Sequence, residues 1–84
     1  MIHMPVVLRH KGYRLFFYSN EGNPLEPLHV HVRKAECVAK FWIEPEVCLD
    51  GCYGFAPSEI RELSEVVRQN REMIERRWHE YFDN

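Results

Sequence analysis

The 84 residues carry 11 Lys and Arg against 13 Asp and Glu, a formal net charge of -2, and 45% of them are apolar. So short a chain fills one hydrophobic core, and its apolar content excludes a disordered tail. The acidic balance argues against a protein that coats nucleic acid through bulk positive charge. We expect a single domain over residues 1–84, with a β-sheet portion at 5–55 and a helix at 57–82.

The cysteine pattern bears on the setting of the protein. Three cysteines, Cys37, Cys48 and Cys52, cannot all pair within one chain, and their scatter matches no disulfide framework. A reducing cytoplasm is therefore the expected location. No apolar run approaches the length of a membrane span, and the first residues lack the continuous apolar core of a signal peptide. We expect no membrane association.

The first two predicted strands form a hairpin. "PVVLRH" and "YRLFFYS" are rich in β-branched and aromatic residues, and the Lys11-Gly12 pair between them suits a two-residue loop. The cross-strand pairs that follow are His10 with Tyr13, Arg9 with Arg14, Leu8 with Leu15, Val7 with Phe16 and Val6 with Phe17. One face of this hairpin is expected to line the core with Val6, Leu8, Leu15 and Phe17.

A second hairpin is predicted after a loop at residues 20–27 that is rich in Asn, Gly and Pro. Its strands are "LHVHVR" and "ECVAKFWI", and a two-residue turn at Lys34-Ala35 matches apolar residues across the pair. The predicted pairs are Arg33 with Glu36, Val32 with Cys37, Val30 with Ala39 and Leu28 with Phe41. Because Lys34-Ala35 is not a favoured turn, a three-residue loop with a bulge is the alternative. One short edge strand is expected near residues 47–49.

The C-terminal part of the chain has a different period. From Pro57 to Phe82, apolar residues recur at intervals of three and four, which predicts one amphipathic helix of about 39 Å. The sheet cannot cover that length, so the final turns with Trp78, Tyr81 and Phe82 are expected to meet a second subunit in a homodimer or to fold back over the edge of the sheet. The predicted class is α+β, an antiparallel sheet of four to five strands with one long C-terminal helix packed on one face.

The stretch "PLHVHVR" alternates apolar and polar residues. If Val30 and Val32 face the helix, then His29, His31 and Arg33 lie on the opposite face of the strand. The two imidazoles and the guanidinium therefore begin a polar outer face.

Neighbouring strands add basic and aromatic side chains to this outer face. Lys40 is predicted opposite His29, Trp42 follows on the same face, and Arg14 joins them together with Arg9 if both hairpins belong to one sheet. Because Arg9 and Arg14 repel each other across the strands, a nearby anion or acidic partner is favoured. Exposed Trp and Arg also anchor protein interfaces. The predicted binding residues are His29, His31, Arg33, Lys40, Trp42 and Arg14.

Two other interpretations of the face stay open. It can be the solvated side of a half-buried sheet, where a few surface aromatics are ordinary. Alternatively, His29 and His31 can bind one metal ion, but two ligands are too few for a zinc site. The further ligands would have to come from Cys48, Cys52, Glu44 or Asp50.

An RNA-cleaving enzyme is a third alternative. His29 and His31 would act as general base and acid, with Arg33 or Lys40 steadying the phosphate. Two neighbours on one strand seldom flank a scissile bond, and the chain has no nucleophile motif, phosphate loop or paired-carboxylate signature. We therefore assign no catalytic residue, favour a non-enzyme over an enzyme and predict no cofactor, and nucleic-acid binding, for example by stacking on Trp42, is not favoured.

Four stretches resemble one family: "GYRLFFYSNEGNPLEPLHVHV", "AKFWIEP", "YGF" and "IERRWHEYF". This family of small prokaryotic proteins is known only as domain of unknown function four-one-six-zero. The resemblance runs over about residues 6 to 82, and its most specific parts are the Pro-x-His-x-His-Val core at 27–32 and the Lys-Phe-Trp strand at 40–42. It implies a bacterial protein without a settled activity, whose partner is a small protein encoded by an adjacent gene in a toxin–antitoxin-like pair.

The chain departs from the family pattern at two positions. Leu28 stands where a second proline is more common before the first histidine. Ala56 stands where a serine N-cap is expected before Pro57, with Glu59 completing a capping box, and this substitution should cost about 1 kcal/mol. Ser58 is the alternative cap.

The residues and the resemblance together predict a non-enzymatic binding module. Its outer sheet face is expected to hold a small protein partner, and the alternatives are an RNA-acting toxin or a metal-binding protein.

Overall fold

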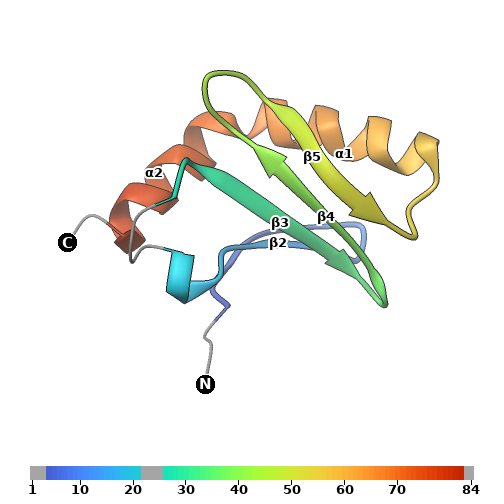
Figure 1. Ribbon diagram of the computed structural model, residues 1–84, viewed down its shortest axis with the longest axis horizontal. Helices are drawn as coiled ribbons and strands as arrows, with labels where there is room; N and C mark the ends of the chain where they lie inside the picture. Colours follow the sequence, from blue (N-terminus) through green and yellow to red (C-terminus); the bar gives the residue numbers. More distant parts are fainter. Residues whose placement is uncertain (1–3, 22–25, 83–84) are drawn as a thin grey trace.

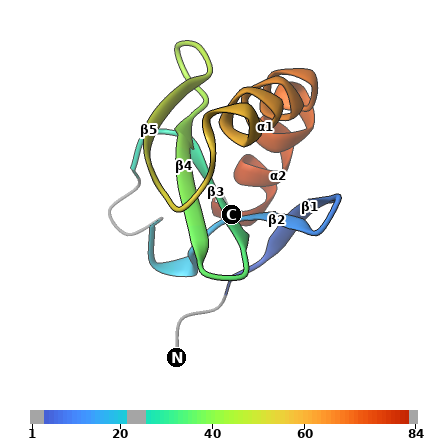
Figure 2. The ribbon, with the colours of Figure 1, turned by 90° about the vertical axis from the view of Figure 1, so that its right-hand side faces the viewer.

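The order of the strands along the chain is also their order in the sheet. The computed structural model describes residues 4–21 and 26–82, and its five strands pair antiparallel in the order β1-β2-β3-β4-β5 (Figure 1). The strands are β1 (Val6–His10), β2 (Tyr13–Phe16), β3 (His29–Lys34), β4 (Cys37–Trp42) and β5 (Cys48–Tyr53), and a 3-10 turn spans Ser19–Glu21. Two helices, α1 (Pro57–Gln69) and α2 (Arg71–Phe82), cover one face of the sheet (Figure 2). The α+β class and the antiparallel sheet are thus confirmed, while residues 22–25 of the predicted loop lie outside the described residues.

The hydrophobic core lies between the sheet and the two helices. Alternate strand residues point toward the helices, so Leu15, Val30 and Phe41 are fully buried. The residues that the helices bury are Leu63, Val66, Val67, Ile74 and Trp78. Because each large side chain contributes roughly 1.5 to 3 kcal/mol when it is buried, packing rather than helix propensity holds α1 and α2 in place.

The first hairpin follows the prediction until a bulge interrupts it. Lys11 and Gly12 both have positive φ, 48° and 83°, which matches the twist of a two-residue hairpin turn. The pairs nearest the turn, from His10 opposite Tyr13 to Leu8 opposite Leu15, are confirmed. Beyond them Val6 pairs with Phe16. The extra residue reverses the alternation, so Val7 is buried and Val6 is exposed, and the predicted place of Val6 in the core is wrong.

The turn of the second hairpin lies one residue later than predicted, so the cross-strand partner of each residue changes by two positions. Its loop is Ala35-Glu36, with Lys34 opposite Cys37 and Val32 opposite Ala39. Because the pairing shifts by an even number of residues, every side chain keeps its predicted face. The cross-strand neighbours do change: His31 lies opposite Lys40, and the predicted pair of His29 with Lys40 is wrong.

Strand β5 forms one edge of the sheet and is longer than the strand predicted at 47–49. Phe41 pairs with Leu49 and Lys40 with Gly51, which leaves Asp50 as the extra residue of a bulge. All six residues of β5 are exposed.

The predicted single helix is two helices, because the chain bends at Asn70. This residue has φ -108° and ψ 14°, outside helical geometry, and its side-chain Nδ2 donates a hydrogen bond to the Val66 carbonyl at 2.8 Å. Asparagine competes for backbone hydrogen bonds in this way, which makes it a poor residue for a helix interior. The Ile74 N–H still bonds to the Asn70 carbonyl at 2.9 Å. The helical path therefore bends at Asn70 and continues into α2 (Figure 1).

The bend carries α2 over the end of the sheet. The indole of Trp78 is 1% exposed, and its ring centroid lies 5.1 Å from that of Phe17 and 4.3 Å from that of Phe82. Of the two alternatives for the final turns, this geometry matches the one in which they fold back. The homodimer stays a prediction, because nothing in a single chain tests it.

The N-terminus of α1 gives a stability prediction. Ala56 has the extended geometry of an N-cap, φ -70° and ψ 155°, and its N–H donates to Glu59 Oε1 at 2.9 Å, which is one half of a capping box. Ser58 lies inside the helix and does not cap it. We expect Ala56→Ser to supply the other half and to raise the free energy of unfolding by about 1 kcal/mol, measured by urea denaturation. Ala56→Val is the control, and an equal gain with valine would contradict the capping explanation.

Candidate functional site

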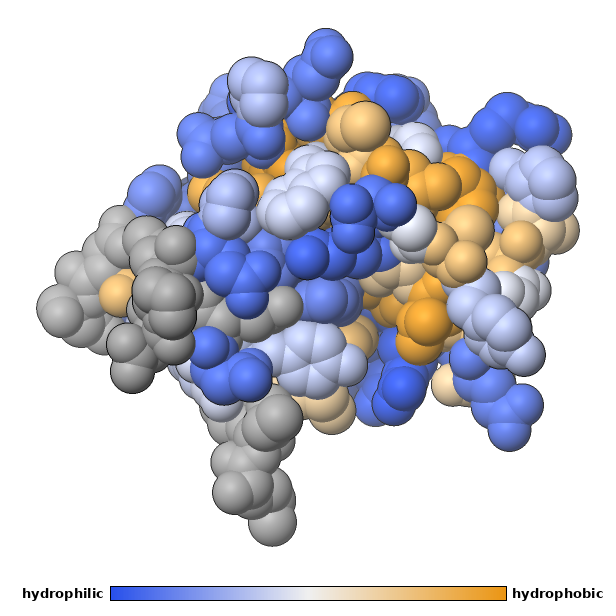
Figure 3. Space-filling model, in the orientation of Figure 1, coloured by the Kyte–Doolittle hydropathy of each residue, from blue (hydrophilic) through white to orange (hydrophobic). Residues whose placement is uncertain are grey.

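The outer face of the sheet, which is the face turned away from α1 and α2, brings most of the predicted binding residues together. Cross-strand pairing aligns one row of side chains, Arg9, Arg14, Arg33, Val38 and Tyr53, and beside it a second row, Phe16, His31, Lys40 and Gly51. In the view of Figure 3, hydrophilic residues cover much of the centre of this face, and hydrophobic surface lies mainly to the right. We call Arg9, Arg14 and Arg33 the arginine row.

A hollow of about 450 Å³ lies on the outer face over β3, β4 and β5. Among the residues that line it are His31, Arg33 and Lys40, together with Tyr18 and Asp50. Three of the six predicted binding residues thus converge on one concave surface. Arg33 and Lys40 offer only hydrogen-bond donors on their side chains, and the His31 ring can donate through a protonated nitrogen, so the hollow suits an oxygen-rich, anionic group.

Aromatic rings hold the imidazole of His31 in place. The centroid of its ring lies 5.6 Å from that of Phe16, with the two planes nearly parallel, and 4.6 Å from that of Tyr18 in an edge-to-face arrangement. Such contacts each contribute about 0.5 to 1.5 kcal/mol beyond area burial. Since Phe16 is itself only 4% exposed, it supports the surface and offers little area to a ligand.

Trp42 and Lys40 form a second group on the same face. The Lys40 ammonium lies 4.3 Å from the centroid of the Trp42 ring, a cation–π contact. The Trp42 indole N–H donates to Asp50 Oδ1 at 3.0 Å, and Lys40 Nζ is 4.0 Å from Glu26 Oε1. Both side chains are partly exposed and pre-positioned by these contacts.

His29 differs from the prediction, because it is fully buried rather than exposed on the outer face. Its Nδ1–H donates to the Pro27 carbonyl at 2.7 Å, and its ring packs between Trp42 and Trp78, with centroid distances of 5.5 Å and 5.3 Å. The predicted alternation of side chains between the two faces of β3 is correct, but α2 folds back over the end of the strand and covers the His29 ring. His29 therefore supports His31, whose ring lies edge-on at 5.0 Å.

The burial of His29 bears on the two sharper alternatives. A substrate in solution reaches His31 but not His29, so this geometry does not favour the pair as general base and acid. Within residues 4–21 and 26–82, no three His, Cys, Asp or Glu side chains lie close enough together to hold a metal ion. Neither alternative thus gains support from the fold.

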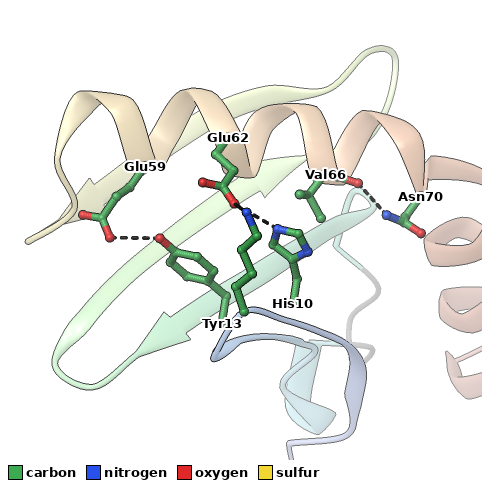
Figure 4. A network of polar contacts seen from close by, with 7 residues as sticks. His10, Tyr13, Glu59, Glu62, Val66 and Asn70 are labelled. Carbon is green, nitrogen blue, oxygen red and sulfur yellow. Dashed lines mark hydrogen bonds and ion pairs between the residues drawn. The ribbon is translucent and has the colours of Figure 1, made fainter.

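A polar cluster that sequence patterns missed joins the first hairpin to α1 (Figure 4). His10 Nε2–H donates to Glu62 Oε2 at 3.0 Å, and Lys11 Nζ lies 3.3 Å from the same oxygen. One turn earlier on α1, the Tyr13 hydroxyl donates to Glu59 Oε2 at 2.9 Å. Only the spacing of the two glutamates, one face of a helix at i and i+3, could have indicated these contacts.

The cluster shifts the titration of its members. Burial of Tyr13, followed by its hydrogen bond to Glu59, raises the pKa of the tyrosine to about 12, so its hydroxyl stays protonated and donates. The Ala56 N–H and then the Tyr13 hydroxyl hold the pKa of Glu59 below its usual value. Glu59 is therefore a carboxylate that receives both bonds at neutral pH.

The acid sensitivity of the fold should depend on Glu62, whose pKa is held below its usual value by His10 and then by Lys11. A depressed carboxyl pKa gives stability that is fully present above the ordinary glutamate pKa, about 4.3, and is lost as pH falls through the folded pKa. We expect Glu62→Gln to lower the urea midpoint at pH 7, and the difference from wild type to shrink below about pH 4. Glu65→Gln on the same helix is the control. A deficit of equal size at about pH 3 would contradict this assignment.

Fold and outer face together define a small α+β domain whose sheet carries a basic and aromatic surface. The family model "Domain of unknown function (DUF4160)" matches residues 12–79, and the chain belongs to this family. No curated protein and no solved structure matches the chain. The family resemblance drawn from the sequence is thereby confirmed. In the described part of the chain, neither helix has the length and apolar character that crossing a membrane requires.

Proposed function

We propose that this protein is a non-enzymatic binding module that holds a small protein partner on the outer face of its sheet. The observation that carries the proposal is the convergence of His31, Arg33 and Lys40 on one hollow of about 450 Å³. Trp42 and Arg14 lie on the same face, and Trp and Arg are the residue types that most often anchor protein interfaces.

Arg33 gives the proposal further support. Its Nε is buried and has no hydrogen-bond partner among the described residues. Buried donors in native proteins are almost always paired, because an unmade bond costs about 1 to 3 kcal/mol. An oxygen acceptor from a partner that enters the hollow would satisfy this group.

The proposed partner is the small protein encoded beside the gene, in a bacterial toxin–antitoxin-like pair. This part of the proposal is supported by the family resemblance alone. A homodimer in the cytoplasm belongs to the same proposal, since a core this small gains from self-association and the free thiols suit a reducing setting. Light scattering that shows a monomer at micromolar concentration would count against the dimer.

Co-expression with the neighbouring gene product, followed by gel filtration, tests the partner. We expect one co-eluting complex for wild type and its loss in the variant Arg33→Ala/Lys40→Ala. The matched control, Arg61→Ala/Arg68→Ala, removes the same charge from the exposed side of α1 and should leave the complex intact. Absence of co-elution with wild type would remove this partner, and retention in the outer-face variant would move the interface elsewhere.

A further inference from the structure

The arginine row concentrates positive charge on a protein of net negative charge. Arg9 lies directly opposite Arg14 across β1 and β2, and Arg14 lies directly opposite Arg33 across β2 and β3. Adjacent strands are about 4.8 Å apart, so the backbone positions of the three arginines lie within about 10 Å of each other. Like charges in directly opposite positions destabilise a sheet.

The chain does not neutralise this row. Among the described residues, none of the three arginines has a carboxylate within 4.0 Å or a side-chain hydrogen bond. Three of the five arginines on the helices, Arg68, Arg71 and Arg76, each lie within 4.0 Å of a glutamate three or four residues away. The chain has 13 acidic residues, so a shortage of carboxylates does not explain why these three arginines lack an ion pair.

We propose that the arginine row binds the carboxylates of an acidic segment of a protein partner that crosses β1, β2 and β3. This assignment rests on the proposed function and names the chemistry of the partner. A guanidinium forms two parallel hydrogen bonds with a carboxylate, and these charge-assisted bonds are the strong ones. Alternate side chains of an extended peptide are about 6.8 Å apart, a spacing that long arginine side chains on neighbouring strands can meet. At least three Asp or Glu residues are therefore expected in the segment.

The aromatic side chains of the outer face favour a peptide over a nucleic acid. Single-stranded nucleic acids need open rings on which bases can stack. Here Phe16 is buried, the rings of Tyr18 and His31 pack against each other, and the Lys40 ammonium lies over Trp42. The exposed ring of Tyr53 is separated from the arginines by Val38. The surface around the row thus offers charge without a stacking platform.

Fluorescence anisotropy with a labelled hexaglutamate peptide tests the assignment. We expect the peptide to bind wild type, and its affinity to fall about tenfold or more in the variant Arg9→Gln/Arg14→Gln/Arg33→Gln, which loses all three guanidinium groups. The matched control, Arg61→Gln/Arg68→Gln/Arg76→Gln, has the same net charge and should bind within about twofold of wild type. Affinity should also drop between about 0.01 M and about 1 M ionic strength, where the Debye length shrinks from about 30 Å to about 3 Å. Circular dichroism establishes that both variants are folded.

Three results would overturn the assignment. The first is an equal loss in both triple variants, which would reduce the effect to net charge. The second is an oligouridine probe that binds more tightly than the peptide with the same dependence on the row. The third is no hexaglutamate binding to wild type. The peptide assay omits the neighbouring gene product, so a failure of co-elution leaves the assignment of the arginine row intact. Conversely, if the triple variant of the arginine row binds the peptide as tightly as wild type, the assignment is overturned even if a protein partner co-elutes.

Discussion

Trp78→Ala is expected to lower the free energy of unfolding by about 3 to 5 kcal/mol, as is typical when a buried tryptophan is truncated. The indole is 1% exposed and contacts Phe17, His29 and Phe82. The total free energy of unfolding of a small domain is only about 5 kcal/mol or a little more, so much of the variant should be unfolded at room temperature. Urea denaturation followed by circular dichroism measures the loss.

Two further variants isolate the cause. Trp78→Phe keeps an aromatic ring between Phe17 and Phe82 and should lose less. Tyr53→Ala removes a ring that is 72% exposed and should change stability by no more than about 0.5 kcal/mol. If Trp78→Ala cost no more than Tyr53→Ala, α2 would not be docked on the end of the sheet in solution.

Gly54→Ala is expected to destabilise the protein by about 2 to 3 kcal/mol through two separate effects. Gly54 has φ +88°, a conformation that an L side chain rarely adopts. A Cβ at this position would also lie 2.8 Å from Cys37 Sγ and 3.4 Å from its Cα. The glycine therefore allows the chain to leave β5 close to the start of β4. Thermal and urea denaturation of the variant measure the combined cost.

A neighbouring glycine provides the matched control. A Cβ at Gly51 would meet nothing within 4 Å, so Gly51→Ala should be close to neutral. The double variant Cys37→Ala/Gly54→Ala removes the sulfur atom and leaves the backbone strain. Relative to Cys37→Ala alone, Gly54→Ala should then cost less than it does in wild type. An equal cost at Gly51 and Gly54 would contradict this explanation.

Local turn chemistry decided how well the strands could be predicted. Lys11-Gly12 supplies the positive φ that a two-residue turn requires, and the register next to it was correct. Ala35-Glu36 carries no such signature, so the second turn was placed too early, although the alternation of Val30 and Val32 still gave the right faces. The bulge at Val7 left no pattern in the sequence.

Tertiary contacts account for the other differences. The apolar period continues through Ile74, so it cannot show that Asn70 bends the helix, although an asparagine inside a helical pattern is a recognised end signal. His29 has the predicted strand parity, but only the folded-back α2 buries it. These two differences have one origin, because the bend at Asn70 brings Trp78 to His29.

The candidate site was partly visible in the sequence. Arg14, His31, Arg33, Lys40 and Trp42 all lie on the predicted face, because alternation alone assigns it. The arginine row could not be predicted in full, since turn chemistry shows how strands pair within a hairpin but not how β2 pairs with β3.

The sequential order of the strands has a consequence for how the chain folds. Each pairing in the sheet joins consecutive strands, whereas the contacts of His10 with Glu62 and of Tyr13 with Glu59 close loops of 52 and 46 residues. Folding slows as contacts span more of the chain, because the entropy of closing long loops is lost before the contacts form. The hairpins can therefore form early at little entropic cost. Docking of α1 onto the first hairpin is then the step that we expect to limit the folding rate.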